Sequence, residues 1–363
     1  MNIQFLTPSL LFNRNNIQKN NSVQKDSFVK SNNTTYPNLA PLAKDTVSFT
    51  ASPMQKILLM RNDRVAYGVL QDIVAEAQKD VDKFVRTLKA GLKGLVESPA
   101  HPDNPIVAGT AGIKGRAKSA RSLGDKIPED MITKGEIDNV GDLRGTRIVM
   151  RAGTQQDYDK LFKELGKMVT RGEFKPVSVE NYRLTSKDSY VSQSTLNKFE
   201  TVCQKMGIYP EIISKPKESG YTAVHLNALL PNGKPVEIQI MGRDMELSKD
   251  IQDQYYKWMF CHKDLDPKYR KIQKVFEEEI PKLDDFQLET LKRYMVDSFD
   301  HARKVPPKQS KRNMNMAKDF LDFPYSLPQR LSYRSIYEMM QECDKAEKLA
   351  KAQKAAKNTS NKG

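Results

Sequence analysis

Apolar residues recur every three or four positions between residues 70 and 95, after a long polar start. The stripe consists of Leu70, Ile73, Val74, Ala77, Val81, Phe84, Val85, Leu88, Leu92 and Leu95. This spacing places the apolar side chains on one face of a helix. The stripe therefore predicts a long helix that packs on a core, followed by a loop over residues 98–115, where Gly and Pro are frequent.

The middle of the chain changes to the patterns that are typical of strands. Residues Thr146–Met150, Tyr221–Leu230 and Pro235–Met241 are rich in β-branched residues or alternate between apolar and polar side chains, and we expect them to be strands. Residues Gln156–Met168 have the period of a helix. This part of the chain is therefore predicted to mix α and β structure.

The segment between the last two predicted strands indicates a hairpin. It contains Asn232-Gly233, which readily supplies the two positive φ angles of a two-residue type I′ turn. Such a turn pairs residue 228 with residue 237, and this places Tyr221 and Glu237 on opposite faces of the sheet. For both to contribute to one site, Tyr221 must lie before the strand, or a bulge must shift the register.

The two ends of the chain differ from the middle. Residues 1–50 are polar and without periodicity, and we expect them to be disordered. Residues 263–363 are predicted to be helical, with breaks at Pro281, at residues 306–307 and at residues 324–328. The last helix carries five lysines spaced by three: Lys345, Lys348, Lys351, Lys354 and Lys357. They indicate either a solvated helix or a basic, partly disordered tail that binds nucleic acid.

The charge composition of the chain indicates which kinds of partner it binds. The 363 residues include 59 Lys and Arg against 45 Asp and Glu, a net charge of +14 that suits phosphates, nucleotides or nucleic acid. No apolar stretch approaches the ~20 residues that a transmembrane helix needs. The three cysteines form no Cys-x-x-Cys pair, and no secretory signal is recognisable at the start. We therefore expect a cytoplasmic protein with no membrane partner.

Basic residues and one hydroxyl gather just after the predicted loop. If this segment is helical, Lys118, Ser122 and Lys126 share one face, because they are four residues apart, and Arg116 lies beside them. Like charges on one stripe destabilise a helix unless an anion lies between them. The segment indicates either a polyphosphate site or a solvated basic face.

Two carboxylates are candidates for metal binding or proton transfer. Asp142 enters a predicted buried strand, where it could bind a hard cation such as Mg²⁺ or act as a turn residue. On the last strand, alternation places Glu237 with Gln239 on one face. The opposite face carries three buried aliphatics: Val236, Ile238 and Ile240.

Four motifs follow one another in an order that resembles the synthetase domain of the RelA/SpoT family of alarmone synthetases. They are G-R-x-K-x-x-x-S-L-x-x-K at 115–126, D-x-x-G-x-R-I-V at 142–149, P-K-x-x-G-Y-x-x-x-H-L at 216–226 and E-I-Q-I at 237–240. The resemblance implies an α+β, nucleotidyltransferase-like mixed sheet flanked by helices over residues 54–262. The helical C-terminal extension follows, and residues 170–207 resemble an insertion.

The resemblance also implies an activity and a role for each residue. The family moves the β,γ-diphosphate of ATP onto the 3′ hydroxyl of GDP or GTP and releases AMP, with Mg²⁺. ATP-binding residues would be Arg116, Lys118, Ser122, Lys126 and Arg147, and acceptor-binding residues Lys217, Tyr221 and His225, with Tyr221 stacked on the guanine. The catalytic residues would be Glu237, Asp142 and Gln239, of which Asp142 and Glu237 would hold the metal.

Departures from the family keep other functions open. Met241 and Ser248 replace an arginine and a tryptophan of the family, and residues 208–213 also differ. The residues that follow the four histidines are Pro, Leu, Lys and Ala, so the His-Asp pair of the family's hydrolase domain is absent. We leave open a toxin-like relative that modifies the 3′ end of tRNA or an adenine nucleotide, and an inactive nucleotide- or RNA-binding module. Binding of tRNA or RNA by the tail and assembly of a homo-oligomer also stay open.

Overall fold

The computed structural model describes most of the chain between residues 64 and 360. The described ranges are 64–124, 137–151, 154–183, 191–216, 221–259, 261, 265–304 and 327–360. The segment predicted to be disordered, residues 1–50, lies outside them. Lys126 and Lys217 also lie outside, so two of the residues predicted to bind nucleotide have no described position.

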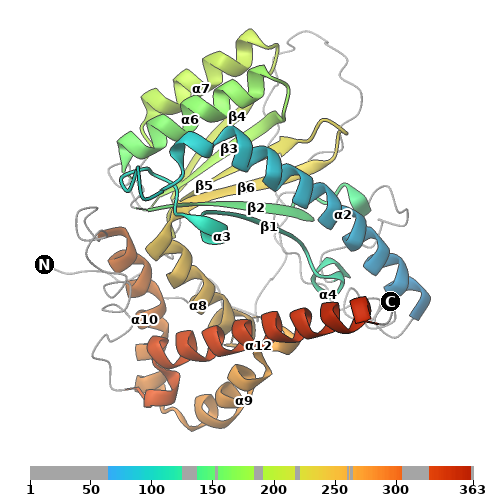
Figure 1. The fold of residues 1–363 in the computed structure, drawn as a ribbon. Coiled ribbons are helices and arrows are strands. Elements are labelled where there is room, and N and C mark those ends of the chain that lie inside the picture. Colours follow the sequence, from blue (N-terminus) through green and yellow to red (C-terminus); the bar gives the residue numbers. More distant parts are fainter. Residues whose placement is uncertain are drawn as a thin grey trace, which may run out of the picture. The chain divides into compact units, whose positions relative to one another are not determined.

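A six-stranded mixed sheet is the centre of the fold (Figure 1). In the order β1-β2-β6-β5-β3-β4, two neighbouring pairs are parallel, β2 with β6 and β3 with β4, and the other three are antiparallel. The strands are β1 (Ile113–Ala117), β2 (Arg144–Met150), β3 (Lys175–Arg183), β4 (Glu211–Pro216), β5 (Ala223–Leu229) and β6 (Pro235–Gly242). The predicted mixed sheet is confirmed. Residues 170–207 supply β3, which lies between β5 and β4 inside the sheet.

Helices α2 (Arg64–Gly91), α6 (Gln155–Thr170) and α7 (Gln193–Lys205) cover one face of the sheet (Figure 1). The stripe predicted from the sequence is the buried face of α2, where Ile73, Ala77 and Leu88 are fully buried. Leu88 packs with Phe162 of α6 and Phe199 of α7 in the main core. Short elements lie along the chain between α2 and β2: η2 (Lys93–Leu95), α3 (Gly109–Gly112) and α4 (Ala120–Gly124).

The chain continues from β6 into helices that have a second core of their own. They are α8 (Arg243–Met259), η3 (Pro267–Tyr269), α9 (Arg270–Glu279), η4 (Ile280–Lys282), α10 (Asp285–Lys304), η6 (Gln329–Leu331) and α12 (Tyr333–Ser360). Tyr255 of α8 stacks on Phe276 and Tyr333, with ring centroids 4.7 and 5.7 Å away. The predicted helical C-terminal part is confirmed. No described helix is both long and apolar enough to cross a membrane.

The hairpin between β5 and β6 differs from the prediction by one residue. Asn227 pairs with Glu237, and Leu230 N–H donates to the Lys234 carbonyl at 2.8 Å, so the loop has three residues and not two. Pro231 has the fixed φ that suits the second position of an ordinary turn, and Gly233 closes the loop with a φ of +78°. The predicted pairing of residues 228 and 237 is therefore wrong.

The basic segment also differs from the prediction. Gly115 and Arg116 belong to strand β1, and helix α4 begins only at Ala120, so Lys118 and Ser122 do not share a helical face. Strand β1 packs closely on α2, because a Cβ at Gly115 would come within 2.6 Å of the Val81 side chain. The glycine thus allows the close approach that holds this segment in the sheet.

A buried arginine joins α2, β2 and the hairpin loop. Arg144 is 1% exposed, and its guanidinium donates to Asp138 and, at 2.9 Å, to Asp80. Lys234 of the loop forms a second ion pair with Asp138, and Asn232 donates to Asp80 at 3.1 Å. Burial by itself would raise the pKa of Asp138, but Lys234 and Arg144 hold this pKa below its usual value.

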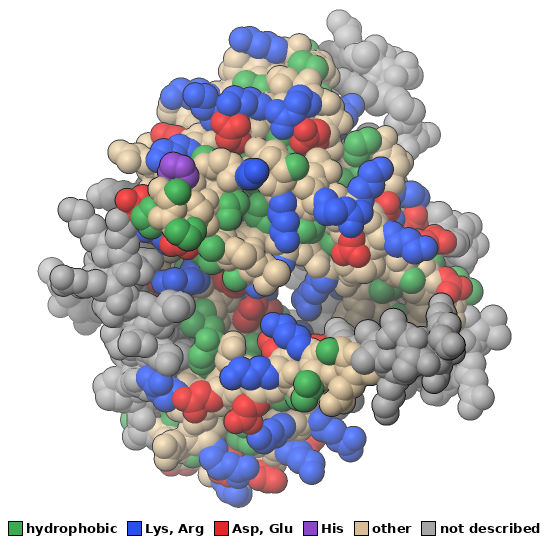
Figure 2. All heavy atoms as spheres, in the orientation of Figure 1, with side chains coloured by type: hydrophobic (Ala, Val, Ile, Leu, Met, Phe, Trp, Pro, Cys, Tyr) green, Lys and Arg blue, Asp and Glu red, His purple; other side chains and the backbone are tan. Residues whose placement is uncertain are grey.

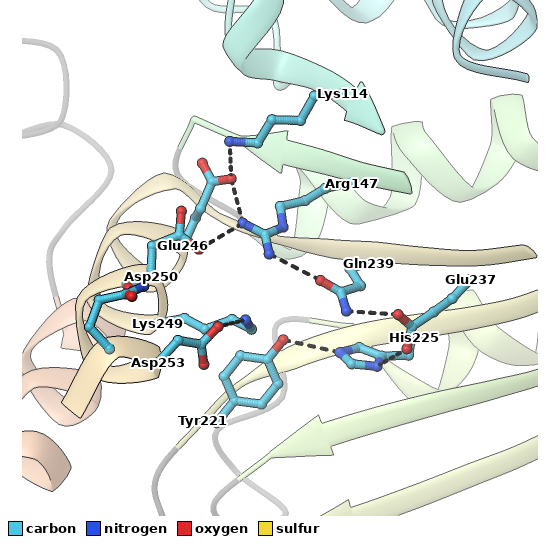
Figure 3. Close-up of polar contacts among 11 residues, drawn as sticks. Lys114, Arg147, Tyr221, His225, Glu237, Gln239, Glu246, Lys249, Asp250 and Asp253 are labelled. Atoms are coloured by element: carbon cyan, nitrogen blue, oxygen red, sulfur yellow. Dashed lines mark hydrogen bonds and ion pairs between the residues drawn. The ribbon is translucent and has the colours of Figure 1, made fainter. Parts of the chain in front are cut away.

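Helix α8 is tied to the sheet by charge. Arg147 of β2 donates to Glu246 and Asp250 of α8 at 2.8 and 3.0 Å, and Lys114 of β1 pairs with Glu246 at 2.6 Å (Figure 3). Desolvation opposes the charge on Arg147, yet the two carboxylates raise the pKa of its guanidinium above the usual value. Their attraction therefore holds α8 against β1 and β2.

We expect the substitution Asp138→Asn to show a pH-dependent cost. A carboxyl whose pKa is lowered by folding stabilises the protein above the unfolded pKa of about 4, and this contribution is lost as the pH falls through the folded pKa. Asp138→Asn should therefore lower the free energy of unfolding by about 1.5–3 kcal/mol at pH 7. Urea titrations at pH 7, 5 and 3 should show this difference shrink. A difference that is constant over this range would contradict the assignment.

We expect Arg147→Met to destabilise the protein by about 2 kcal/mol, between the ~1 kcal/mol of an exposed ion pair and the ~3–5 kcal/mol of a buried one. Arg147 is 15% exposed and Glu246 11%. Lys271→Met is a matched control, since it breaks an ion pair whose members are 64% and 62% exposed and should leave stability almost unchanged. Thermal unfolding of both variants measures the difference, and equal effects would disprove a structural role for Arg147.

Candidate active site

The candidate site lies on the face of the sheet that α2, α6 and α7 leave uncovered. Along β6, Val236, Ile238 and Ile240 are buried in the main core, so Glu237 and Gln239 point to the opposite face, as predicted. The register places His225 of β5 beside Gln239, and Arg147 of β2 on its other side. Side chains from three adjacent strands therefore meet on one face.

Glu237 accepts a hydrogen bond at each carboxylate oxygen. His225 Nδ1 donates to Oε1 and Gln239 Nε2 donates to Oε2, both at 2.8 Å (Figure 3). Burial raises the pKa of Glu237, but the bonds from His225 and Gln239 outweigh it, so this pKa lies below its usual value. The carboxylate is thus ionised at neutral pH and fixed in orientation, while its side chain is 17% exposed.

The hydrogen bonds continue from Glu237 in both directions. Gln239 Oε1 accepts from Arg147 Nη2 at 3.3 Å, which connects the carboxylate to α8. On the other side, the Tyr221 hydroxyl lies 3.0 Å from His225 Nε2 (Figure 3). We call these five residues, Tyr221, His225, Glu237, Gln239 and Arg147, the polar network. It contains one residue predicted to bind ATP, two predicted to bind the acceptor and two predicted to be catalytic.

Tyr221 lies just before β5, which begins at Ala223, as one of the two predicted alternatives requires. Its ring centroid is 5.7 Å from that of Phe299, which α10 supplies, and 6.3 Å from that of Tyr182 of β3. Burial raises the pKa of the Tyr221 hydroxyl well above its usual value. The ring is therefore an uncharged aromatic surface with a fixed hydroxyl.

Two of the departures from the RelA/SpoT pattern face α10. Met241, where the family has arginine, is fully buried in a cluster with Phe299. Ser248, where the family has tryptophan, is also buried, and its Oγ donates to Ser298 of α10 at 2.7 Å. Both substitutions are accounted for by packing against the C-terminal helices.

Basic residues and a second carboxylate lie near the network. Lys118 Nζ pairs with Asp142 at 2.5 Å, and the negative charge of Asp142 acts on Glu237. Arg116 is exposed on β1, and Ser122 accepts a hydrogen bond from Ser119 at 3.0 Å. The structure thus brings Asp142 and Lys118 into the electrostatic surroundings of Glu237, whereas Ser122 bonds within its own segment.

Several charged residues of α8 were missed by sequence reasoning. Glu246 and Asp250 are four residues apart, and such a like-charged pair on one helical face signals a cation between them. Lys257 was missed as well: burial lowers its pKa, and the charges of Arg116 and Lys249 lower it further. Arg116, Lys249 and Lys257 thus gather positive charge between β1 and α8, where Asp253 pairs with Lys249 at 2.6 Å; we call these three residues the positive region.

The visible surface is hollowed beside these elements. Figure 2 shows an opening between the sheet and α12, with Lys and Arg side chains on its border. Among the described residues, no group of three or more His, Cys, Asp or Glu side chains is arranged to hold a metal ion. The arrangement offers an oriented base, a second carboxylate, aromatic rings and positive charge. These features suit the transfer of a phosphoryl group, in which positioning and neutralisation of charge carry most of the catalysis.

Comparison with known proteins gave one family match and several solved structures. The small alarmone synthetase 1 from Bacillus subtilis is 19% identical, with 66% of this chain and 94% of that chain covered and a TM-score of 0.38. For the same enzyme bound to its product pppGpp the values are 21%, 65%, 94% and 0.37. For the small alarmone synthetase 2 from Bacillus subtilis they are 14%, 73%, 98% and 0.35. No curated protein sequence matched the chain.

These structural similarities are low, and the assignment of a RelA/SpoT region therefore depends on the sequence match. Residues 115–259 match the family described as the region found in RelA / SpoT proteins. The matched range contains all five members of the polar network, and also Lys118 and Asp142. The chain thus carries a RelA/SpoT region, and the candidate site lies within it.

Proposed function

We propose that the protein is a pyrophosphokinase that transfers the β,γ-diphosphate of ATP to the 3′ hydroxyl of GDP or GTP and releases AMP. The observation that carries this proposal is the ionised, doubly hydrogen-bonded Glu237 carboxylate on the open face of a RelA/SpoT region. In the transfer, the 3′ oxygen bonds to the β-phosphorus of ATP while the bond from that phosphorus to the α,β-bridging oxygen breaks. AMP leaves with that oxygen.

Glu237 is assigned the role of general base. As an ionised carboxylate it can accept the proton of the acceptor's 3′ hydroxyl when the oxygen attacks. The hydrogen bonds from His225 and Gln239 hold the carboxylate in one orientation, so little reorganisation is needed when the acceptor binds. A base with a lowered pKa is weak, and correct placement must therefore supply most of its effect.

The residues around the base suit the two nucleotides. Tyr221 is an uncharged aromatic ring, a partner for a purine that is worth roughly 1–3 kcal/mol in stacking. Lys118 and the positive region of Arg116, Lys249 and Lys257 suit the triphosphate of ATP. For Arg147 we propose a role other than the predicted binding of ATP, because Glu246 and Asp250 already accept its hydrogen bonds. We assign it to holding Gln239 and α8.

The donor set fits a magnesium ion that is shared with the substrate. Asp142 and Glu237 are close enough for the charge of one to act on the other, and one or two carboxylates plus substrate phosphates are the usual ligands of Mg²⁺. Asp142 would hold the ion, in exchange for its present partner Lys118. When bound, Mg²⁺ neutralises charge on the phosphates. Lys118, once released, would be able to contact those phosphates.

Transfer of radioactive phosphate tests the proposal. Purified protein with Mg²⁺ and ATP labelled on the γ-phosphate is offered GDP, GTP, ATP or bulk tRNA, and the products are separated by thin-layer chromatography. We expect label on GDP or GTP. Glu237→Gln should reduce the rate by about 10²- to 10⁴-fold, because the amide cannot accept the proton.

Glu289→Gln is the matched control, since this carboxylate on α10 is 64% exposed and far along the chain from the RelA/SpoT region. It should keep the full rate. Label on tRNA alone, or on ATP alone, would overturn the guanine acceptor and leave a relative with another substrate. No transfer to any acceptor would overturn the enzymatic activity itself.

A further inference from the structure

Tyr221, the proposed platform for the acceptor's purine, precedes the strand pairs of β5. The pairing of β5 with β3 begins at Ala223, and the pairing of β5 with β6 begins at Val224. The orientation of the Tyr221 ring therefore depends mainly on contacts with other side chains. A ring that is free to change its rotamer loses conformational entropy when a base stacks on it, and this loss weakens binding.

Three described rings lie beside that of Tyr221. The ring centroid of Tyr182 is 6.3 Å from that of Tyr221, and the ring centroid of His225 is 5.9 Å away. Phe299 of α10 comes closest, with centroids 5.7 Å apart and planes at 64°, an edge-to-face contact. Such a contact favours one tilt of the two rings relative to each other. Phe299 therefore restricts the orientation of the Tyr221 ring.

The ring of Phe299 is itself fixed by the packing of α10. Phe299 is 2% exposed and packs with Met241 of β6 and Met245 of α8. The preceding residue, Ser298, accepts a hydrogen bond from Ser248 of α8 at 2.7 Å, and α10 lies beside α8 (Figure 1). The contact with Tyr221 is thus formed by a side chain that the protein holds in place before a nucleotide binds.

We propose that Phe299 is a positioning residue for the acceptor, because its edge-to-face contact holds the Tyr221 ring in the orientation on which the purine stacks. Phe299 lies outside residues 115–259, the range that matches the RelA/SpoT family. The C-terminal helices then form part of the acceptor site. The inference rests on the proposed function in one respect, namely that a purine stacks on Tyr221.

The substitution Phe299→Leu removes the ring and keeps an apolar side chain. We expect KM for the guanine nucleotide to rise about 3- to 10-fold, which is the worth of one aromatic pair. Because the lost contact affects binding of the acceptor, KM for ATP and kcat should stay within about twofold of the wild-type values. Steady-state kinetics with each nucleotide varied in turn measures these changes. An unchanged or a lower KM for the guanine nucleotide would overturn the proposal.

Phe276→Leu is the matched control in the C-terminal helices. Phe276 is fully buried, and its ring stacks on that of Tyr255 with centroids 4.7 Å apart. Loss of this ring should lower the melting temperature at least as much as Phe299→Leu does, without raising KM for the guanine nucleotide. If KM rises equally in both variants, the effect comes from loosening of the C-terminal helices, and the specific role of Phe299 is wrong.

A double-mutant cycle tests whether Phe299 acts through Tyr221. In a Tyr221→Leu background the ring that Phe299 positions is absent. Adding Phe299→Leu to this background should therefore raise KM for the guanine nucleotide by less than about twofold. A full rise of about 3- to 10-fold in that background would mean that Phe299 acts independently of Tyr221, and it would contradict the positioning role.

Equilibrium dialysis with radiolabelled GDP, in the absence of ATP, keeps this test separate from the proposed function. Weaker binding by Phe299→Leu but not by Phe276→Leu supports the role of Phe299, even if the wild type transfers no diphosphate and the proposed function fails. Equal affinity in the wild type and both variants, in a protein that does transfer diphosphate, leaves the proposed function standing and overturns the role of Phe299. A wild-type protein that binds no GDP would overturn both.

Discussion

The register between β5 and β6 decides on which face of the sheet the Glu237 carboxylate lies relative to His225. Side chains alternate along a strand, so a shift of one residue would move the carboxylate away from the imidazole and bury it among the aliphatics of the main core. The three-residue loop sets this register, and Pro231 and Gly233 define the loop through their backbone angles. The buried Arg144 then fixes the loop to α2 through Asp80 and Asp138. Backbone geometry and a buried ion pair thus place the strands of the site through contacts that lie outside the polar network.

Within the network, Gln239 has a role that few residue types can fill. It accepts from Arg147 with its oxygen and donates to Glu237 with its nitrogen, so a cation and an anion are connected without neutralising each other directly. A carboxylate at position 239 would repel Glu237, and a cation would repel Arg147. Arg147 also bonds to α8. Through Arg147 and Gln239, the position of α8 can therefore affect the orientation of the Glu237 carboxylate.

Sequence patterns predicted those features of the fold that depend on the spacing of residues within one helix or strand. The stripe from Leu70 gave the buried face of α2, and alternation along β6 separated Glu237 and Gln239 from the aliphatic core. The turn register was predicted wrongly, because Asn232-Gly233 is compatible with two loop lengths and Pro231 selects between them. The spacing of Glu246 and Asp250 signals a cation but does not identify Arg147, and no local pattern specifies the contact of Tyr221 with Phe299, because these partners come from distant segments. Two predicted ligands, Lys126 and Lys217, lie outside the described residues.

Met241 of β6 is buried under Phe299 of α10. This contact joins the RelA/SpoT region to the C-terminal helices, which are separate in the sequence. An arginine at position 241, as in the family, would bring a cation into the apolar cluster of Ala223, Met245 and Phe299, where it would lose its hydration without gaining a partner of opposite charge among the members of that cluster. The arginine and the docked α10 are thus alternatives. A domain boundary placed between β6 and α10 would therefore cut through one packed cluster.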